Sequence, residues 1–142
     1  MPMHATPPGF EPLVWPGFCT LIGPLFAQPQ GQDVVIGLGI EPRHANTGGF
    51  AHGGLIATLA DIALTHAILR RSGPEFYIVT VSFNIDFTGG ARLGDWVEAH
   101  TLITKSEGSL AFGQCNLLVE GKPIVHASGV LKRLRRQQAE TA

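Results

Sequence analysis

Residues 46–69 read NTGGFAHGGLIATLADIALTHAIL, and this stretch decides the fold. After its second pair of glycines, Ala, Leu and Ile predominate, and two arginines followed by Ser-Gly-Pro then end the pattern. This composition, with basic residues in the last turn and a stop signal after it, predicts a helix from about Gly53 to Arg71. The helix is apolar nearly all round, so we expect it to be buried on most sides.

Asp61 lies in the middle of this apolar helix. A carboxylate in an apolar interior is costly unless it is paired, and Asp is a poor residue for the interior of a helix. Thr58 and Thr65 lie about one turn away on the same face, so the polar stripe is narrow and rich in hydroxyl groups. Two interpretations are open: a satisfied polar residue at a subunit interface, or a catalytic acid, base or nucleophile in a partly apolar cleft.

The start of the helix carries the pair Gly53-Gly54, preceded by His52. The first backbone N–H groups of a helix have no partner within it and carry the positive end of its dipole. Glycine lets a ligand approach that backbone, so this end is a candidate site for an anion or a carbonyl oxygen. A plain tight turn is the simpler explanation of two glycines, and a structural hydrogen bond is the simpler role for His52.

The strand signal is strongest at Tyr77–Phe87, where side chains alternate with a period of two. One face should carry Tyr77, Val79, Val81, Phe83, Ile85 and Phe87, and the other Ile78, Thr80, Ser82, Asn84 and Asp86. Further strands are expected at about 17–27, 33–41, 95–105, 109–119 and 123–134. The GLG at 37–39 is interpreted as a bulge or bend. One long helix and a run of antiparallel strands indicate an α+β fold in which a curved sheet of five to six strands wraps the helix.

The composition predicts a single domain that forms oligomers. The chain has 142 residues, of which only 15% are charged, against a usual share of about 25%. A net charge of −1 gives no field that would attract nucleic acid or an anionic membrane. We expect a proline-rich arm without regular structure at 1–16, one domain at 17–136 and a tail at 137–142, with the basic residues 132–136 solvated.

Neither a signal peptide nor a membrane span is predicted, and two distant cysteines indicate a reducing compartment, so a cytoplasmic protein is expected. The six histidines show no metal spacing, and no metal site or cofactor is predicted. The Gly-x-Ser-x-Gly elbow of serine hydrolases is missing, as are the glycine patterns that bind nucleotide phosphates.

Asn46, the triplet His52-Gly53-Gly54 and the pattern Leu-x-Ala-x-Leu-x-Asp ending at Asp61 resemble one known family. This family is the hotdog-fold acyl-CoA thioesterases of the phenylacetate-pathway (PaaI-like) type. The likeness continues through RHANTGGFAHGG, TVSFNIDFTGGARLGDWVEA and SLAFGQCNLLVEGKPIVHASG and covers roughly residues 17–134. It implies a hotdog fold, homodimers and often homotetramers, and hydrolysis of a coenzyme A thioester to an acid and a free thiol.

The resemblance also implies roles for individual residues. Asp61 matches the catalytic carboxylate, which attacks the thioester carbon or activates water. The N–H of Gly53 matches the oxyanion donor, and Asn46 matches a residue that holds water or substrate from the other subunit. Thr80 falls where some relatives carry a hydroxyl near the site. The substrate site is expected to include His52, Gly54, Thr58, Thr65 and Arg92.

Two other functions remain open from the sequence. A hydratase or dehydratase of the same fold would need His52 as a base, and the adjoining glycines fit the thioesterase better. A non-catalytic acyl-CoA binding protein would have no use for so costly a carboxylate as Asp61. Arg43, Arg92 and the cluster 132–136 are candidates for the phosphates of coenzyme A, although each is more simply a solvated charge.

Overall fold

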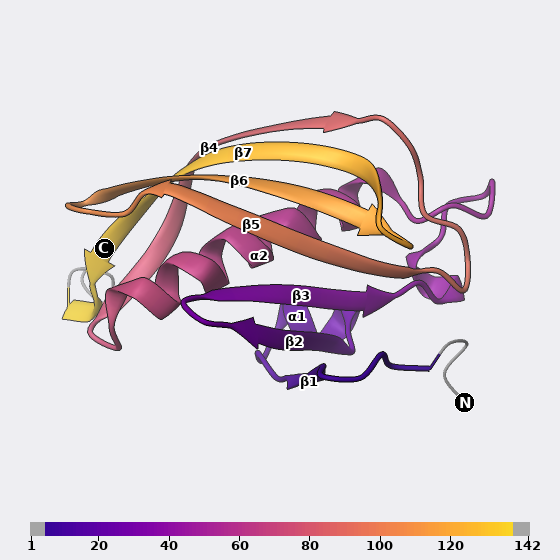
Figure 1. The fold of residues 1–142 in the computed structure, drawn as a ribbon, viewed down its shortest axis with the longest axis horizontal. Coiled ribbons are helices and arrows are strands. Elements are labelled where there is room, and N and C mark those ends of the chain that lie inside the picture. Colours follow the sequence, from indigo (N-terminus) through magenta and orange to yellow (C-terminus); the bar gives the residue numbers. More distant parts are fainter. Residues whose placement is uncertain (1–4, 138–142) are drawn as a thin grey trace.

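The computed structural model describes residues 5–137 and consists of one antiparallel sheet curved around one long helix (Figure 1). In chain order the elements are β1 (Glu11–Leu13), α1 (Phe18–Ile22), β2 (Leu25–Gln30), β3 (Asp33–Gly39), a 3₁₀ turn η1 (Pro42–His44), α2 (Gly53–Ser72), β4 (Phe76–Phe87), β5 (Trp96–Lys105), β6 (Leu110–Val119) and β7 (Lys122–Arg135). The predicted α+β class is confirmed, and the sheet has seven strands instead of five to six because the N-terminal arm adds β1.

The sheet has the strand order β1-β2-β3-β5-β6-β7-β4, and every neighbouring pair is antiparallel. The chain leaves β3, passes through α2 on the concave side of the sheet, and returns as β4 at the opposite edge (Figure 1). β5, β6 and β7 then form consecutive hairpins between these two parts. The β6–β7 turn uses Glu120 and Gly121, with φ of 50° and 76°, and two positive φ values are typical of a tight two-residue hairpin turn.

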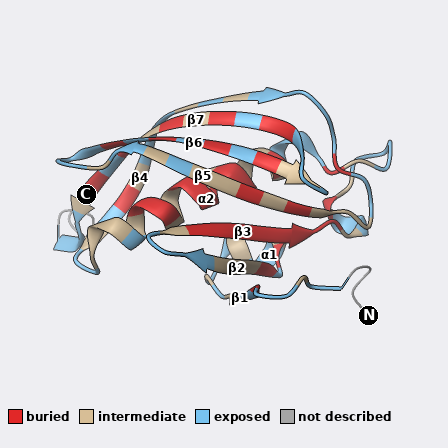
Figure 2. Ribbon diagram, viewed as in Figure 1, coloured by how far each residue is buried: buried red, intermediate tan, exposed pale blue. Residues whose placement is uncertain are grey.

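The helix α2 begins at Gly53, as the sequence predicts, and ends at Ser72, one residue beyond the predicted end. Its sheet-facing side chains are fully or nearly buried: Ile56, Leu59, Ala60, Ile62, Ala63, Leu64, Ala67 and Ile68. Buried residues also cover β3 and the inner faces of β5, β6 and β7 (Figure 2). By length and composition α2 would suit a membrane span, but here it is the core helix of the sheet.

Two paired glycines let α2 approach the sheet closely. Gly113 on β6 and Gly129 on β7 lie opposite each other in the ladder. A Cβ on Gly113 would lie 2.9 Å from Leu64 Cδ2, and one on Gly129 would lie 3.2 Å from Leu64 Cδ1. Leu64 therefore fills a depression in the sheet that exists only because both positions lack a side chain. We call Gly113 and Gly129 the glycine notch.

The N-terminal arm is more ordered than expected. Glu11–Leu13 pairs with β2, so the prediction of an arm without regular structure is wrong for this segment. Phe10 is buried, and its ring packs edge-on against Trp96 at 5.2 Å. Residues 18–22 form the short helix α1, not the start of the strand expected at 17–27. The following strand, β2, begins at Leu25.

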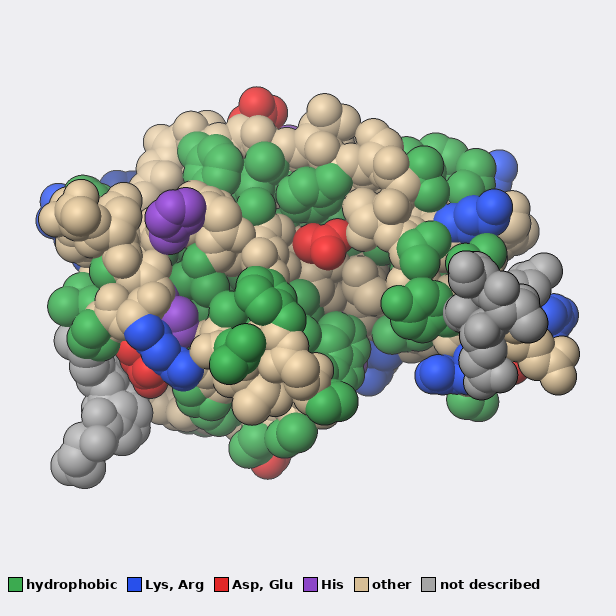
Figure 3. Space-filling model, turned by 180° about the vertical axis from the view of Figure 1, so that it is seen from behind, with side chains coloured by type: hydrophobic (Ala, Val, Ile, Leu, Met, Phe, Trp, Pro, Cys, Tyr) green, Lys and Arg blue, Asp and Glu red, His purple; other side chains and the backbone are tan. Residues whose placement is uncertain are grey.

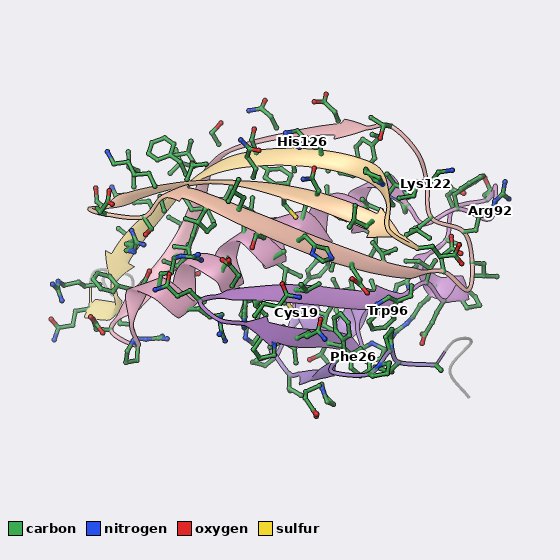
Figure 4. All side chains as sticks on the ribbon, in the orientation of Figure 1. Cys19, Phe26, Arg92, Trp96, Lys122 and His126 are labelled. Carbon is green, nitrogen blue, oxygen red and sulfur yellow. The ribbon has the colours of Figure 1, made fainter. Side chains whose placement is uncertain are left out.

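Two other expectations need correction. Residues 37–39 are regular strand within β3, and Gly37 is required for a different reason: a Cβ there would lie 2.2 Å from the indole ring of Trp96. Trp96 lies over β2 and β3 beside Phe26, with ring centroids 5.7 Å apart (Figure 4). The basic segment 132–136 is not simply solvated, because Arg133 is 8% exposed in β7 and Arg136 donates to the Pro74 carbonyl.

Candidate active site

Asp61 lies in the third turn of α2, on the face that the sheet of its own chain leaves uncovered. Its carboxylate is half-buried, and Thr80 Oγ1 donates a hydrogen bond to Asp61 Oδ1 at 2.7 Å. The structure thus brings together two residues that are 19 positions apart in the sequence. One carboxylate oxygen is held by this bond, which fixes the orientation of the group.

A cavity of about 950 Å³ opens beside Asp61. It lies between α2, the first half of β4 and the N-terminal segment around α1, and its surface is mostly apolar. Figure 3 shows this side of the molecule, where an acidic side chain stands among hydrophobic and uncharged ones near the middle of the face. The cavity is large enough for a small organic group, and a mostly apolar lining with few polar groups is typical of ligand sites.

Thr58 and Thr65 line the same cavity, so the hydroxyl-rich stripe predicted from the helix is present on one face. Thr58 Oγ1 donates to the Gly54 carbonyl at 2.8 Å, which is a local bond along the helix. Thr65 contributes its side chain to the wall. Neither threonine hydrogen-bonds Asp61, and Thr80 alone holds the carboxylate among the residues that the structure describes.

A bulge in β4 aims Thr80 at the helix. The β4–β7 register shifts between Thr80 and Ser82, so Val81 is an extra residue and is 59% exposed. Before the bulge Ile78 and Thr80 face α2, and after it Phe83 and Ile85 pack against the core. The single uninterrupted alternation expected for Tyr77–Phe87 is therefore wrong, because the bulge exchanges the two faces halfway along the strand.

The start of α2 forms a second cluster. His52 is its N-cap, and His52 Nδ1 accepts the Gly54 N–H at 2.9 Å, so that N–H is occupied within the chain. The Gly53 N–H points to no acceptor within residues 5–137. It is the one of the two predicted glycine donors that remains available to a ligand.

The packing within the chain does not require a glycine at position 53. Its φ is negative, and a Cβ built there would meet only the Phe87 ring, at an ordinary contact distance of 3.6 Å. Gly54 is tighter, since a Cβ would lie 3.2 Å from His52 Nδ1. The absence of a side chain at 53 therefore has no explanation inside the described chain, and it leaves the helix end open to approach from outside.

Asn46 and Arg92 belong to this second cluster. Asn46 Oδ1 accepts the N–H groups of Gly48 and Phe50 at 2.9 and 3.2 Å, which shapes the loop before α2. The Arg92 guanidinium lies 4.5 Å from the centroid of the Phe50 ring, at the loop end of the molecule (Figure 4). Arg92 is exposed and lies beside the loop, not in the Asp61 cavity.

The two clusters are separate within one chain. Asp61 is eight positions beyond Gly53 on the same helix, which corresponds to about 12 Å along the axis. A thioester carbonyl bound at the Gly53 N–H cannot contact Asp61 of that chain. The sequence-based site is therefore divided into Asp61, Thr80, Thr58 and Thr65 on one side and Asn46, His52, Gly53, Gly54 and Arg92 on the other.

Sequence reasoning missed the part of the cavity that the N-terminal segment supplies. Trp15 and Cys19 line the cavity, and the Trp15 ring packs against His66 of α2 with centroids 5.1 Å apart and planes tilted by 40°. Burial raises the pKa of the Cys19 thiol, so this side chain contributes apolar surface more than reactivity. The available signal was a tryptophan inside a proline-rich segment, which is an unusual residue for an arm that packs against nothing.

Comparison with known proteins defines the class. Residues 48–125 match the thioesterase superfamily. A Pseudomonas aeruginosa protein named as an esterase is 40% identical over 130 residues, which are 90% of this chain and 97% of that protein. Human acyl-coenzyme A thioesterase 13 is 35% identical over 86 residues, 59% of each chain. The chain belongs to the thioesterase superfamily, and the sequence-based resemblance is confirmed.

Solved structures agree with the fold. Zebrafish thioesterase superfamily member 2 superposes with a TM-score of 0.73 and 30% identity, covering 84% of this chain and 88% of that one. A mutant of the phenylacetic acid degradation protein PaaI from Thermus thermophilus gives a TM-score of 0.73 at 25% identity and covers 82% and 98%. The curved sheet around α2 is thus the hotdog fold of the thioesterases.

Proposed function

We propose that the protein is an acyl-CoA thioesterase that hydrolyses a coenzyme A thioester to a carboxylic acid and free coenzyme A. The observation that carries this proposal is the Asp61 carboxylate, oriented by Thr80 at the edge of a mostly apolar cavity. A half-buried acid without a basic partner is costly, and general-base or nucleophilic catalysis accounts for its presence. Relatives named as acyl-coenzyme A thioesterases support the substrate class.

In this mechanism the carboxylate either takes a proton from water or attacks the thioester carbon itself. The carbonyl oxygen becomes negative as the tetrahedral intermediate forms, and the Gly53 N–H at the positive end of α2 stabilises that charge. Collapse of the intermediate breaks the C–S bond, and the thiolate takes up a proton to leave as coenzyme A. If water was the nucleophile, the carboxylic acid is released directly; if Asp61 was, a mixed anhydride between Asp61 and the acyl group remains, and water then hydrolyses it to the acid and free Asp61. Hydrolysis in ¹⁸O-labelled water under single-turnover conditions detects nucleophilic attack when water opens the anhydride at the Asp61 carbonyl, because the product then carries an unlabelled Asp61 oxygen. Rapid-quench trapping of an acyl–Asp61 anhydride detects it when water attacks the acyl carbon.

The separation of Gly53 from Asp61 supports a site that two chains share. We propose a two-fold homodimer in which Asn46 and Gly53 of one chain face Asp61 and Thr80 of the other. The distance of about 12 Å along one helix supports this arrangement, because one thioester carbonyl cannot contact both Gly53 and Asp61 of the same chain. The unexplained glycine at 53 is then accounted for by the approach of substrate and of the second chain.

The edge strand β4 offers the surface for this pairing. β4 has 12 residues and, within residues 5–137, pairs only with β7, so no described strand pairs with its other edge. Long unpaired edges are normally covered, because they otherwise recruit other chains. Tyr77, Val81 and Phe87 are 48%, 59% and 51% exposed on this strand. A self-complementary two-fold contact along β4 would cover them and run the two α2 helices antiparallel.

The hydratase alternative has less support. It needs His52 as a base, but His52 Nδ1 already accepts the Gly54 N–H. His52 is also the N-cap of α2, whereas Asp61 lies two turns further along the helix. The cheapest test is release of free thiol from a panel of acyl-CoAs that includes aromatic and medium-chain acyl groups. Turnover that is lost in Asp61→Asn supports the thioesterase, whereas hydration of enoyl-CoA without thiol release would replace it.

Mixed dimers test the shared site. Asn46→Ala and Asp61→Asn should each be nearly inactive alone. After co-expression, random pairing makes about half of the dimers mixed, and one site in each is intact, so about a quarter of wild-type activity should return. Mixed dimers that are confirmed by mass but remain inactive would show that Asn46 and Asp61 do not act in one composite site.

A further inference from the structure

His44, in the loop before α2, has a buried imidazole ring that the candidate site does not use. The residue is 4% exposed, and among residues 5–137 Arg133 is the only other one with a polar or charged side chain that is buried. A buried polar group is costly unless its donors and acceptors are satisfied. The partners of the His44 ring therefore show what this residue does.

Both nitrogens of the ring are hydrogen-bonded. His44 Nδ1 accepts the Glu41 N–H at 2.9 Å. A ring nitrogen that accepts a hydrogen bond carries no proton, so His44 is the neutral tautomer with its proton on Nε2. Nε2 then donates to the Ile22 carbonyl, and the two atoms are 2.6 Å apart. The rigid ring thus joins two segments that are 22 positions apart in the sequence.

The first of these segments is the short helix α1. Ile22 is its last residue, and a carbonyl at the end of a helix needs a donor from outside the helix. Cys19, one turn earlier, lines the Asp61 cavity together with Trp15. The bond from His44 Nε2 therefore anchors the helix that forms one wall of this cavity.

A second bond reaches α1 from the neighbouring residue. Arg43 Nη1 donates to the Leu21 carbonyl at 2.8 Å. This guanidinium is exposed, so water competes for the bond, whereas the bond from His44 is shielded from water. His44 is therefore the stronger of the two anchors.

The other segment is the loop that leads into α2. The Glu41 N–H bond to the ring closes the turn η1, of which His44 is the last residue. The carbonyl of His44 then accepts the His52 N–H at 2.8 Å. His52 is the N-cap of α2 and directly precedes Gly53. The turn that His44 closes therefore holds the backbone that aims the Gly53 N–H.

We propose that His44 is a positioning residue for thioester hydrolysis, an inference that rests on the proposed function. Through Nδ1 it holds the start of α2, and through Nε2 it holds the wall of the Asp61 cavity. In the proposed dimer these two regions belong to different sites, because Gly53 of one chain serves Asp61 of the other. One imidazole thus supports the oxyanion end of one site and the cavity wall of the second.

Two substitutions separate the two bonds. The amide oxygen of an asparagine lies as many bonds from Cα as Nδ1, so His44→Asn keeps an acceptor for the Glu41 N–H and loses the bond to Ile22. The amide nitrogen of a glutamine lies as many bonds from Cα as Nε2, so His44→Gln keeps the bond to Ile22 and loses the one to Glu41. His126→Gln, at an exposed position of β7, is the control with the same chemical change.

The two variants should differ in steady-state kinetics. His44→Gln should lower kcat about tenfold or more on every acyl-CoA, with KM within about twofold of wild type, because a displaced oxyanion donor loses much of its effect. His44→Asn should keep kcat on a short acyl-CoA within about twofold, but change the ratio of kcat/KM between a short and a bulky acyl group about fivefold or more, because the cavity wall moves. Equal losses on all acyl groups in both variants, in proportion to the unfolded fraction, would make His44 a purely structural residue.

Combining His44→Gln with Gly53→Ala tests whether His44 acts through Gly53. If both changes impair the same N–H, the double variant should be little slower than Gly53→Ala alone. Losses in kcat that simply multiply would overturn this part of the proposal. The control His126→Gln should match wild type in every assay.

Hydrogen–deuterium exchange in the free protein makes the result independent of turnover. The amides of residues 17–23 should exchange faster in His44→Asn but not in His44→Gln, and those of 45–54 faster in His44→Gln but not in His44→Asn. Unchanged exchange of both segments in both variants would overturn the proposal. If the wild type hydrolyses no thioester, the proposed function fails, while the exchange rates still show whether His44 holds both segments.

Discussion

Replacement of Asp61 by Asn separates catalysis from folding more cleanly than any other change in this protein. The substitution exchanges one carboxylate oxygen for an NH₂ group and removes the charge. The remaining amide oxygen can still accept the Thr80 hydroxyl, which donates to Asp61 Oδ1 at 2.7 Å in the native protein. No Lys, Arg or His among residues 5–137 forms an ion pair with Asp61, so the change breaks no salt bridge.

The expected magnitudes follow from these contacts. Loss of a general base or nucleophile lowers kcat by about 10²- to 10⁴-fold, which is roughly 3–5 kcal/mol of transition-state stabilisation. The free energy of unfolding should stay within about 1 kcal/mol of wild type, or rise slightly, because a half-buried unpaired charge becomes neutral. Activity and stability should therefore change in different directions.

The assay follows thiol release from a good acyl-CoA substrate together with the thermal melting temperature. Asp86→Asn is the matched control, since it makes the same chemical change at an exposed position of β4. A kcat within about fivefold of wild type would refute the catalytic role of Asp61. A loss of several kcal/mol of stability, with activity falling in proportion to the unfolded fraction, would instead assign the carboxylate to the folding of the subunit.

Three further predictions concern the surroundings of the site. Thr80→Val keeps the side-chain volume at position 80 but removes the hydroxyl that donates to Asp61. We expect kcat to fall about ten- to a hundredfold in steady-state kinetics, as for other hydrogen bonds to charged groups. An unchanged kcat would mean that this hydrogen bond has no role in catalysis. Gly53→Ala should melt like wild type, because the added methyl meets only Phe87 at 3.6 Å, and it should lower kcat more than it raises KM; a rise in KM alone would limit Gly53 to shaping the entrance. Gly113→Val forces a side chain into the space of Leu64 and should cost about 1–3 kcal/mol in denaturant unfolding, and a melting curve identical to wild type would show that the notch is not tightly packed.

Much of the fold was predictable from local patterns. One helix and three strands were predicted with no end more than one residue from its observed position: 53–71, 95–105, 109–119 and 123–134. Each of these segments is long and strongly patterned, with turn-forming residues at its ends. The sequence Ser72-Gly73-Pro74 correctly predicted the end of α2, because Gly73 adopts a φ of 95°, a conformation that other residues rarely take.

The remaining elements depend on contacts that no local pattern contains. Residues 18–22 were expected to be part of a strand because a short, mostly apolar run fits either period, and only packing made them helical. The bulge at Val81 is invisible in the alternation, since the sequence stays regular across it. Gly37 is explained only by Trp96, which lies 59 positions away in the chain and packs on it through the β3–β5 pairing.

The candidate site also contains residues that were found from the sequence and contacts that only the structure shows. Asp61 was found from the sequence because a carboxylate in an apolar helix conflicts with its surroundings. The contact with Thr80 was suggested by family resemblance alone, and the structure places the two side chains in hydrogen-bond contact. Arg133 was grouped with solvated charges because a basic tail is usually exposed, and its burial depends on the β5–β6 turn folding over β7.

The glycine notch fixes the position of α2 on the sheet. Leu64 is three positions beyond Asp61 and occupies the depression between Gly113 on β6 and Gly129 on β7, the strand that pairs with β4. Helices that pack on smooth surfaces can slide or rotate by small amounts at little cost, but a side chain held in a depression fixes both the axial position and the rotation of its helix. The glycine notch therefore helps to set the distance between Asp61 and the Thr80 hydroxyl on β4, although neither glycine lines the cavity beside Asp61. An alanine at either glycine would push Leu64 and its helix away from the sheet and so displace the Asp61 carboxylate. We therefore expect these two positions to affect the geometry of the active site without contributing a side chain to it.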